Sequence, residues 1–356
     1  MITLRGSPFE QGLAHGEALR DEIRHNVNVY FQRFEEEVGL SKAEVLERSS
    51  AYEDAIKQKS PDYYAAMRGV AEGSGTDLTI ITALNIRYEL LYYEFGVADG
   101  CTSFALAPGR TEQKELFIGQ NWDWIPQVKG ALLRATHEDG LQTLSFTEAG
   151  IVGGKIGMNS ARLALAINGL TSTADDWQNF RTPFHVRCYD ILRQRTFEEA
   201  LSVVREEARA CSANFVIAQA PDKLIDIEAA PDALYEPALD EGVVVHANHF
   251  VDPEAAGVAE PPEDEHRPQS YERHKRLSTL LHDQPTFGIE EVKARLRDHQ
   301  GHPNSICRHP DTSDPEFERY ETVTSVVMEL NSLTMFVSDG PPCQNEYEVR
   351  CLEADS

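Results

Sequence analysis

The sequence predicts an α+β fold in which helices and antiparallel strands form separate blocks. Three observations predict it. The first hundred residues carry helical periodicity, the pattern changes abruptly at Gly100-Cys101 to short runs typical of strands, and blocks of helices and strands then follow one another. Such blocks favour a layered α+β architecture over alternating βαβ units.

The segment from residue 8 to about residue 98 predicts a series of helices. Apolar residues recur at intervals of three and four among charged ones, and Ser41 with Glu44 resembles a capping box. Pro61 and the Gly-rich turn at residues 73–77 separate the later helices. The expected helices contain residues 19–34, begin near residues 41 and 61, and contain residues 84–93.

After Gly100 the sequence predicts a meander of antiparallel strands, because short apolar runs are bounded by turn residues. The expected strands span residues 103–106, 116–119, 141–146, 151–156, 163–167, 214–219, 223–228, 243–247, 321–330 and 333–338. Helices are expected at residues 183–209 and about 270–298. The acidic, Pro-containing segment 253–268 is expected to be a solvated surface loop.

The charge balance excludes two classes of partner. The 356 residues include 33 basic and 59 acidic ones, a net charge of −26 that would repel nucleic acid and anionic membranes. No stretch approaches the roughly 20 apolar residues of a membrane span, and the N-terminus lacks a secretory pattern. We therefore expect a cytoplasmic protein. Only nine basic residues are lysine, which fits either a high-salt habitat or an ordinary acidic protein.

Cysteine and histidine spacing predicts no metal site. The six cysteines lie far apart without a CxxC pair, so neither a disulfide framework nor a zinc ribbon is expected. His246 and His249 would need a shared face and a carboxylate such as Glu228, yet the preceding valines indicate a strand that turns them to opposite faces. The segment Gly150–Gly157 lacks GxGxxG spacing, so no nucleotide cofactor is expected.

Cys101 follows Gly100 at the change from helices to strands. Its sulfur could attack the Gly100 carbonyl, and hydrolysis of the thioester would create a chain that starts at Cys101. The new α-amino group, with a pKa of ~7.7–8.0, could take the proton of a thiol whose pKa is ~8.5. No GxSxG elbow supports a serine nucleophile. A papain-like pair of Cys101 with a distant histidine is the other option, although the flanking residues do not match that signature.

Several motifs resemble the peptidase C45 family, also called the acyl-coenzyme A:6-aminopenicillanic acid acyltransferase family, among the N-terminal-nucleophile (Ntn) hydrolases. The matching segments are Gly6–Gly12 with His15-Gly16, Gly100–Ser103, Gly119–Trp124, Gly157–Asn159 leading to Ile167–Gly169, His246–Phe250, Asn304–His309 and Thr324–Glu329. They extend over nearly the whole chain. Their order is more specific than any single motif.

The resemblance implies a four-layer αββα sandwich of the Ntn-hydrolase type. It also implies a helical pro-segment of residues 1–100, cleaved from a catalytic domain of residues 101–356 and retained as a heterodimer of the two fragments. No metal or dissociable cofactor is implied. The expected partner is a small acyl amide or acyl thioester, including acyl-coenzyme A.

The resemblance also implies a role for each of five residues. Cys101 would be the nucleophile and Asp123 the carboxylate that orients its α-amino group. Asn248 would donate to the oxyanion, and Asn168 would line the same pocket. Arg308 would steady the cysteine or a substrate carboxylate, the alternative being a surface arginine in a Pro-bounded loop.

The implied reaction moves an acyl group through acyl-Cys101 to an amine or to water. The related penicillin V acylases and bile-salt hydrolases have arginine where this chain has Gln120, and they lack a pro-segment of this length. Both differences favour the acyltransferase branch. Two alternatives stay open, a pure hydrolase of N-acyl amino acids or acylated peptides and an uncut acidic binding protein.

Overall fold

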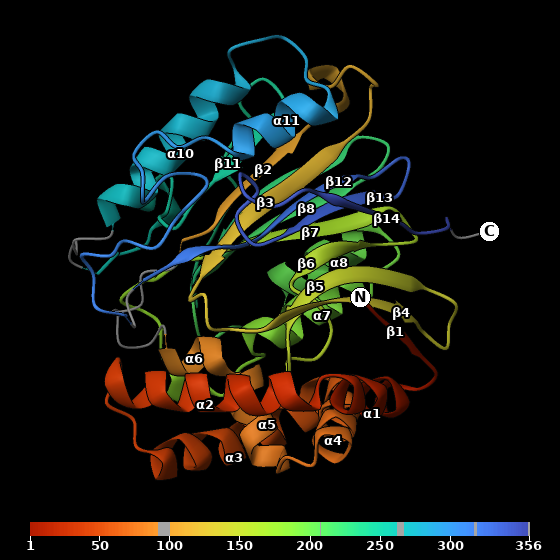
Figure 1. The fold of residues 1–356 in the computed structure, drawn as a ribbon, viewed down its shortest axis with the longest axis vertical. Coiled ribbons are helices and arrows are strands. Elements are labelled where there is room, and N and C mark those ends of the chain that lie inside the picture. The colour runs from red at the N-terminus through yellow and green to blue at the C-terminus, as the bar shows by residue number, and fades with distance from the viewer. Residues whose placement is uncertain (92–99, 207, 262–266, 317–318, 355–356) are drawn as a thin grey trace.

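Two β-sheets stacked face to face form the centre of the molecule, and helices cover the outer face of each (Figure 1). The computed structural model describes residues 1–356 except 92–99, 207, 262–266, 317–318 and 355–356. This arrangement of layers confirms the predicted αββα sandwich. No helix in the described part of the chain is long and apolar enough to cross a bilayer.

The larger sheet has eight strands in the order β1-β4-β5-β6-β7-β8-β9-β10, and the smaller has six in the order β11-β2-β3-β12-β13-β14. Among the named strands, all pairings are antiparallel except the parallel pair β1 and β4. The strands are β1 (Ile2–Arg5), β2 (Thr102–Leu106), β3 (Phe117–Trp124), β4 (Gly130–Thr136), β5 (Gln142–Glu148), β6 (Ile156–Asn159), β7 (Leu163–Gly169), β8 (Ala213–Gln219), β9 (Lys223–Ala229), β10 (Leu234–Tyr235), β11 (Val243–His246), β12 (Glu321–Glu329), β13 (Thr334–Asp339) and β14 (Glu348–Cys351).

The helices form three groups (Figure 1). Helices α1 to α6 lie together at one end of the molecule, α7 and α8 lie against the larger sheet, and α10 and α11 cover the smaller sheet. Their bounds are α1 (Pro8–Ala18), α2 (Arg20–Glu36), α3 (Lys42–Lys59), α4 (Pro61–Ser74), α5 (Leu78–Asn85), α6 (Arg87–Leu91), α7 (Phe184–Leu192), α8 (Phe197–Arg205), α9 (Pro253–Ala256), α10 (Arg267–Leu281) and α11 (Ile289–Leu296), with 3-10 turns at Pro108–Arg110 and Trp177–Asn179.

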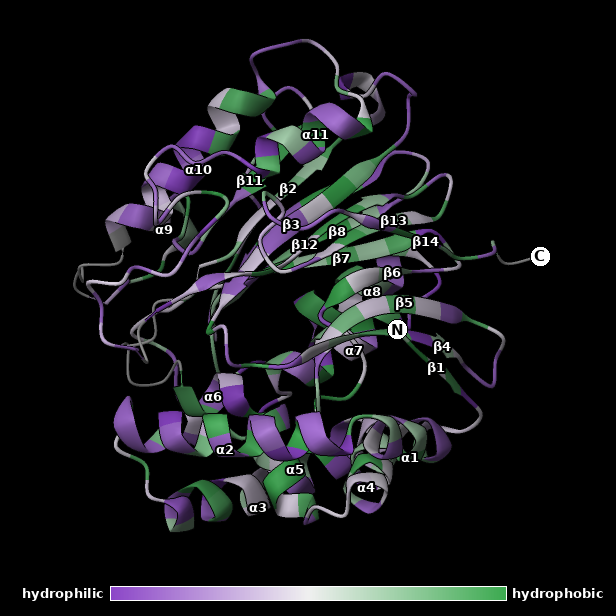
Figure 2. Cartoon of the chain, viewed as in Figure 1, coloured by the Kyte–Doolittle hydropathy of each residue, from purple (hydrophilic) through white to green (hydrophobic). Residues whose placement is uncertain are grey.

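Side chains that alternate between the two faces of β2 and β3 contribute to two separate apolar clusters. Ala105 and Trp122 belong to the apolar cluster between the sheets, whereas Phe104 and Phe117 belong to the cluster under α10 and α11. Neighbouring residues on a strand point to opposite faces, so the smaller sheet is buried on both sides. Figure 2 shows hydrophobic and hydrophilic residues interspersed along its strands, and α10 as largely hydrophilic. Burial of each large side chain contributes roughly 1.5–3 kcal/mol.

Several local predictions are confirmed. Ser41 caps α3 in a reciprocal capping box with Glu44, and α4 begins at Pro61. Gly75 adopts a left-handed conformation at the end of α4, where the turn was expected.

Other local predictions are wrong. The strand expected at residues 151–156 begins only at Ile156, because Gly150 and Gly153 have φ values of 97° and 64°, which a strand does not tolerate. The helix expected at residues 84–93 is divided between α5 and α6, and its last two residues lie outside the described residues. The loop expected at 253–268 contains the short helix α9 and the first residues of α10. Strands β1, β4, β10 and β14 were not predicted.

Candidate active site

Cys101 lies immediately before β2, in the apolar cluster between the two sheets, and its side chain is fully buried. Thr102 pairs with Asn121 across β2 and β3. Continuing this antiparallel register brings Cys101 level with Trp122 and Gly100 level with Asp123. The Gly100-Cys101 peptide therefore lies beside the end of β3.

Gly100 is enclosed by Asp123 and Arg308. A Cβ atom on Gly100 would collide with Nη1 of Arg308 and would lie 3.0 Å from Cβ of Asp123. The Thr322 hydroxyl links the Asp123 side chain to the Arg308 backbone, since it donates to Asp123 Oδ1 at 2.7 Å and accepts the Arg308 backbone N–H at 2.9 Å. The structure thus places two predicted site residues against the junction, at a position where a larger residue would force the Arg308 side chain to move.

Arg308 is buried, with 2% of its surface exposed. Its Nη2 donates to Gln269 Oε1 at 3.1 Å, and its guanidinium lies 5.1 Å from the centre of the Tyr320 ring. The alternative of a surface arginine is therefore wrong. A buried guanidinium is held in one direction by such contacts, here toward Gly100.

Asn168, near the end of β7 in the facing sheet, reaches across to Cys101. Its Nδ2 donates to the Cys101 carbonyl at 3.1 Å, and its Oδ1 accepts the Ser103 hydroxyl at 2.5 Å. The structure therefore brings Asn168 and Cys101 together, and the amide joins the two sheets at the candidate site.

Asn248 lies just beyond β11. Its Nδ2 donates to the Gly169 carbonyl at 3.1 Å, and its backbone N–H donates to the Ser270 hydroxyl at 2.7 Å. Gly169 follows Asn168 in β7, so Asn248 contacts β7 one residue beyond Asn168. In the continuous chain the Asn248 amide donates to a backbone carbonyl.

Arg273 on α10 is a site residue that sequence reasoning missed. It is 2% exposed, and its Nη1 donates to the Cys101 carbonyl at 2.7 Å while its Nη2 donates to Asn248 Oδ1 at 3.0 Å. One guanidinium thus positions the candidate nucleophile and the candidate oxyanion donor together. α10 is rich in charged residues, so periodicity gave no signal that separates Arg273 from a solvated arginine.

A buried charge cluster lies beside Trp122. Glu148 forms ion pairs with Arg87 and Lys155, and Lys155 Nζ lies 3.3 Å from the centre of the Trp122 ring. Burial alone would raise the pKa of Glu148, but the two cations outweigh it and hold the pKa far below its usual value. Burial lowers the pKa of Lys155 to about 8, although Glu148 and the Cys101 thiolate both act to raise it. Lys155 was not predicted from sequence.

Gln120 also joins the two sheets, because its Oε1 accepts the backbone N–H of Ile167 at 2.7 Å. It is fully buried. At this position the chain therefore has a neutral amide that bonds to the neighbour of Asn168.

His246 and His249 do not share a site. His246 ends β11 and lies 2.8 Å from Glu228 Oε1, whereas Nδ1 of His249 lies 2.7 Å from the Ser270 hydroxyl. The negative charges of Asp226 and Glu228 raise the pKa of His246 against the effect of its burial. The two rings have different partners, but His249 lies beyond the end of β11, so the expected alternation along one strand does not apply to it. Among the described residues, the side chains grouped for a metal ion are elsewhere, at Cys307.

Comparison with known proteins decides the family. A family model described as acyl-coenzyme A:6-aminopenicillanic acid acyl-transferase matches residues 110–340, well over half of the chain. The chain belongs to this family. It is therefore an enzyme of the acyltransferase family, as the sequence motifs predicted.

One relative and two solved structures illustrate the likeness. The acyl-coenzyme A:6-aminopenicillanic-acid-acyltransferase 40 kDa form of Emericella nidulans is 29% identical over 317 residues, covering 86% of this chain and 84% of that protein. A mutant conjugated bile acid hydrolase from Clostridium perfringens has a TM-score of 0.46 at 11% identity and covers 71% of this chain and 97% of its own. A Caenorhabditis elegans orthologue of N-acylethanolamine-hydrolyzing acid amidase has a TM-score of 0.46 at 16% identity and covers 64% of this chain and 92% of its own.

Proposed function

We propose that this acyltransferase-family enzyme cleaves its own Gly100-Cys101 bond and then uses Cys101 as an N-terminal nucleophile. The observation that carries the proposal is the enclosure of Gly100 by Asp123 and Arg308. A carboxylate and a guanidinium at one peptide bond are the groups needed to hold an amine and a developing oxyanion. Metal or cofactor chemistry has no part in the proposal.

The first step is an acyl shift within the chain. Sγ of Cys101 attacks the Gly100 carbonyl carbon, the C–N bond breaks, and the nitrogen takes up a proton to become the α-amino group of Cys101. Water then hydrolyses the thioester, giving a carboxylate on Gly100 and a free thiol on Cys101. Arg308 lies against Gly100 and would stabilise the negative charge on its oxygen. Asp123, at the same glycine, would bind the new amine.

Turnover of an external substrate repeats this chemistry. The α-amine takes the thiol proton, and Sγ attacks an acyl carbonyl, whose leaving group departs with that proton. The Asn248 amide would release its hydrogen bond to the Gly169 carbonyl and donate to the oxyanion instead. An amine or water then attacks acyl-Cys101, and the thiol is restored. Because Cys101 is fully buried in the continuous chain, the groups around it must rearrange after cleavage before a substrate can reach the sulfur.

The two fragments, residues 1–100 and 101–356, would stay together after cleavage. Ile23 and Tyr30 of the first fragment belong to the apolar cluster that contains Cys101. Asn26 donates to the Ala149 carbonyl at 3.1 Å, and Arg87 pairs with Glu148. Buried apolar contacts and ion pairs of this kind resist separation.

The proposed substrate is an acyl amide or acyl thioester, with an acyl-coenzyme A thioester among the donors. The Emericella nidulans relative, named for acyl-coenzyme A and 6-aminopenicillanic acid, supports this class. Hydrolysis of N-acyl amino acids or acylated peptides uses the same residues and differs only in the acceptor. The neutral Gln120 fits the acyltransferase branch.

An acyl-transfer assay with the Cys101→Ala variant tests the proposal. An acyl-coenzyme A is offered with and without a primary amine, and transferred amide and free acid are both measured by mass spectrometry. We expect the wild type to form amide and Cys101→Ala to form neither product while remaining a single folded chain. Cys351→Ser, at an exposed cysteine of β14, is the matched control and should behave as wild type. If the wild type forms free acid and no amide, the enzyme is a hydrolase. If Cys101→Ala turns over as fast as the wild type, Cys101 is not the nucleophile.

A further inference from the structure

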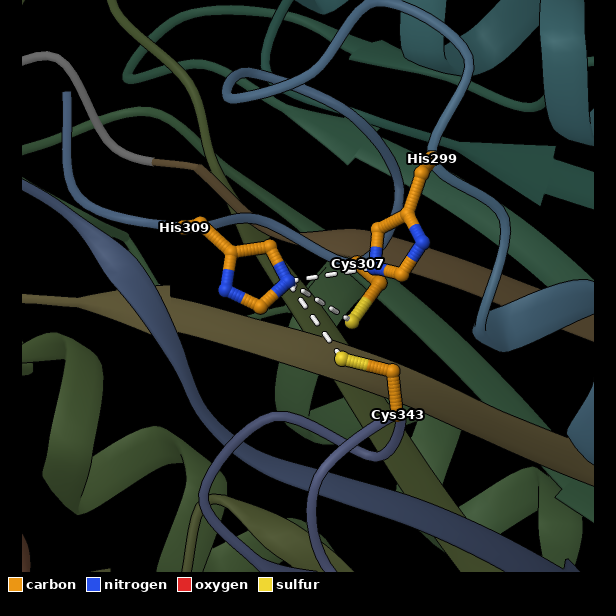
Figure 3. A group of neighbouring side chains, drawn as sticks. All are labelled: His299, Cys307, His309 and Cys343. Atoms are coloured by element: carbon orange, nitrogen blue, oxygen red, sulfur yellow. Dashed lines mark hydrogen bonds between the residues drawn. The ribbon is translucent and has the colours of Figure 1, made fainter.

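Four side chains with metal-binding atoms meet outside the smaller sheet (Figure 3). His299, Cys307 and His309 come from the loop between α11 and β12, and Cys343 comes from the turn between β13 and β14. Figure 3 shows the two thiols and His299 directed toward the ring of His309. The cluster joins two loops that lie more than thirty residues apart in the sequence.

The spacing of the four atoms fits one ion. Nε2 of His309 lies 3.1 Å from Nε2 of His299, 3.4 Å from Sγ of Cys343 and 3.8 Å from Sγ of Cys307. All four atoms lie within 4.8 Å of one another. A tetrahedral zinc ion, with bonds of about 2.0–2.1 Å to nitrogen and about 2.3 Å to sulfur, places its ligand atoms about 3.3–3.8 Å apart.

We propose that His299, Cys307, His309 and Cys343 bind one structural zinc ion in a Cys₂His₂ site. Four protein ligands close a tetrahedral shell, which is typical of structural zinc. Thiolate and imidazole together favour zinc over magnesium or calcium, which prefer oxygen.

The chemistry of the four groups supports this assignment. Neutral imidazole is the form that ligates a metal, and each of the two rings offers one nitrogen to the cluster. Burial raises the pKa of the Cys307 thiol. An ion would displace its proton, as zinc does from coordinating thiols.

The ion would also fix the loop that carries Arg308. Its ligands Cys307 and His309 flank this residue, and the Arg308 backbone N–H donates to Thr322, whose hydroxyl donates to Asp123. Because both neighbours of Arg308 would be bound to the ion, its backbone would be fixed and its guanidinium held beside Gly100. This consequence rests on the proposed function, whereas the zinc site itself does not.

Metal analysis of the full-length protein tests the site. The protein is purified under reducing conditions, stripped with a chelator, titrated with Zn²⁺ alone, and its bound zinc is measured by mass spectrometry after gel filtration. We expect one zinc per chain in the wild type, and loss of at least tenfold in affinity in Cys343→Ser and in His299→Ala. Both residues are exposed, so these variants should fold, which circular dichroism checks.

Two matched variants serve as controls. Cys351→Ser and His25→Ala change a cysteine and a histidine outside the cluster and should keep one zinc per chain. Titration with Co²⁺ should give thiolate-to-cobalt charge-transfer absorption in the wild type and weaken it in Cys343→Ser. The same measurements on Cys101→Ala separate this proposal from the proposed function, because that variant should bind zinc normally.

Three results would overturn the site. One is a wild type that binds no zinc after reduction. Another is equal zinc affinity in the wild type, Cys343→Ser and His299→Ala. The third is a disulfide between Cys307 and Cys343 in the active protein, found by peptide mapping without reduction.

Discussion

Cys101 and Cys307 are both buried cysteines near Arg308, yet their surroundings differ. At Cys101, Asn168 and Arg273 donate hydrogen bonds to the backbone carbonyl, and the carboxylate of Asp123 lies at the preceding residue. At Cys307 the neighbours are imidazoles and a second thiol. Burial and residue type are the same in both, so they do not distinguish the proposed nucleophile from the proposed metal ligand, whereas the neighbouring groups do.

The largest effect is expected from Asn248→Ala. Loss of an oxyanion donor lowers turnover about 10²–10³-fold, whereas cleavage at Gly100 should be slowed or preserved. Steady-state kinetics and gel electrophoresis measure the two separately. Asn28→Ala, on an exposed face of α2, is the control. Unchanged turnover in Asn248→Ala would remove this residue from the Cys101 site.

Glu89 on α6 gives the free energy of unfolding a pH dependence. Burial raises the pKa of Glu89 to about 7, although its Oε1 accepts the Phe184 backbone N–H. The folded state thus holds this proton more tightly than the unfolded state, and stability falls as pH rises from about 4.5 through 7, by about 3 kcal/mol from this group.

Glu89→Gln should remove that component of the free energy of unfolding. Denaturant unfolding of the Cys101→Ala precursor, with and without Glu89→Gln, is measured from pH 4.5 to 8. Glu35→Gln, exposed on α2, is the control. If the free energy of unfolding depended on pH in the same way with and without Glu89→Gln, the assignment to Glu89 would be wrong. The Cys307 cluster has no part in this titration, so a change in zinc content in Glu89→Gln would also contradict it.

Arg273→Lys should have a smaller effect. Lysine keeps the positive charge but has one terminal nitrogen. It therefore cannot donate to both the Cys101 carbonyl and Asn248 Oδ1, as Nη1 and Nη2 of Arg273 do. Loss of one charge-assisted hydrogen bond, roughly 1.5 kcal/mol, predicts turnover about tenfold lower with KM less affected. Arg276→Lys, one turn later on α10 and paired with Asp298, is the matched control. Equal kinetics in both variants would make Arg273 a structural residue only.

Removing zinc should have the smallest effect on catalysis. The ion would stabilise the loop around Arg308 and not touch substrate, so the stripped protein should melt about 5 °C lower and lose less activity than Asn248→Ala. Differential scanning fluorimetry and the transfer assay measure both. An activity loss as large as that of Asn248→Ala would place the ion in the reaction itself.

Local sequence rules predicted much of the fold and of the candidate site. Capping boxes and periodicity lie within one element, so Ser41 and Pro61 were interpretable from sequence. The parallel pairing of β1 with β4 joins residues about 130 apart, and no local pattern encodes it. The strand predicted at residues 151–156 was wrong because glycine conformations override apolar content.

The site residues divide in the same way. Asp123, Asn168 and Asn248 lie within motifs, whereas Arg273 lies in a helix of charged residues and contributes only through tertiary packing. The proposed zinc ligands are partly recognisable in the sequence, since His299, Cys307 and His309 fall within eleven residues. Cys343, the fourth ligand, reaches them only when β12 and β13 fold back on each other.

The central claim is that the working enzyme begins a new chain at Cys101, and intact mass spectrometry of the purified active protein tests it most directly. We predict two species that account for residues 1–100 and 101–356, the second with cysteine at its N-terminus. Active protein of a single unbroken mass near 39.8 kDa would contradict the account.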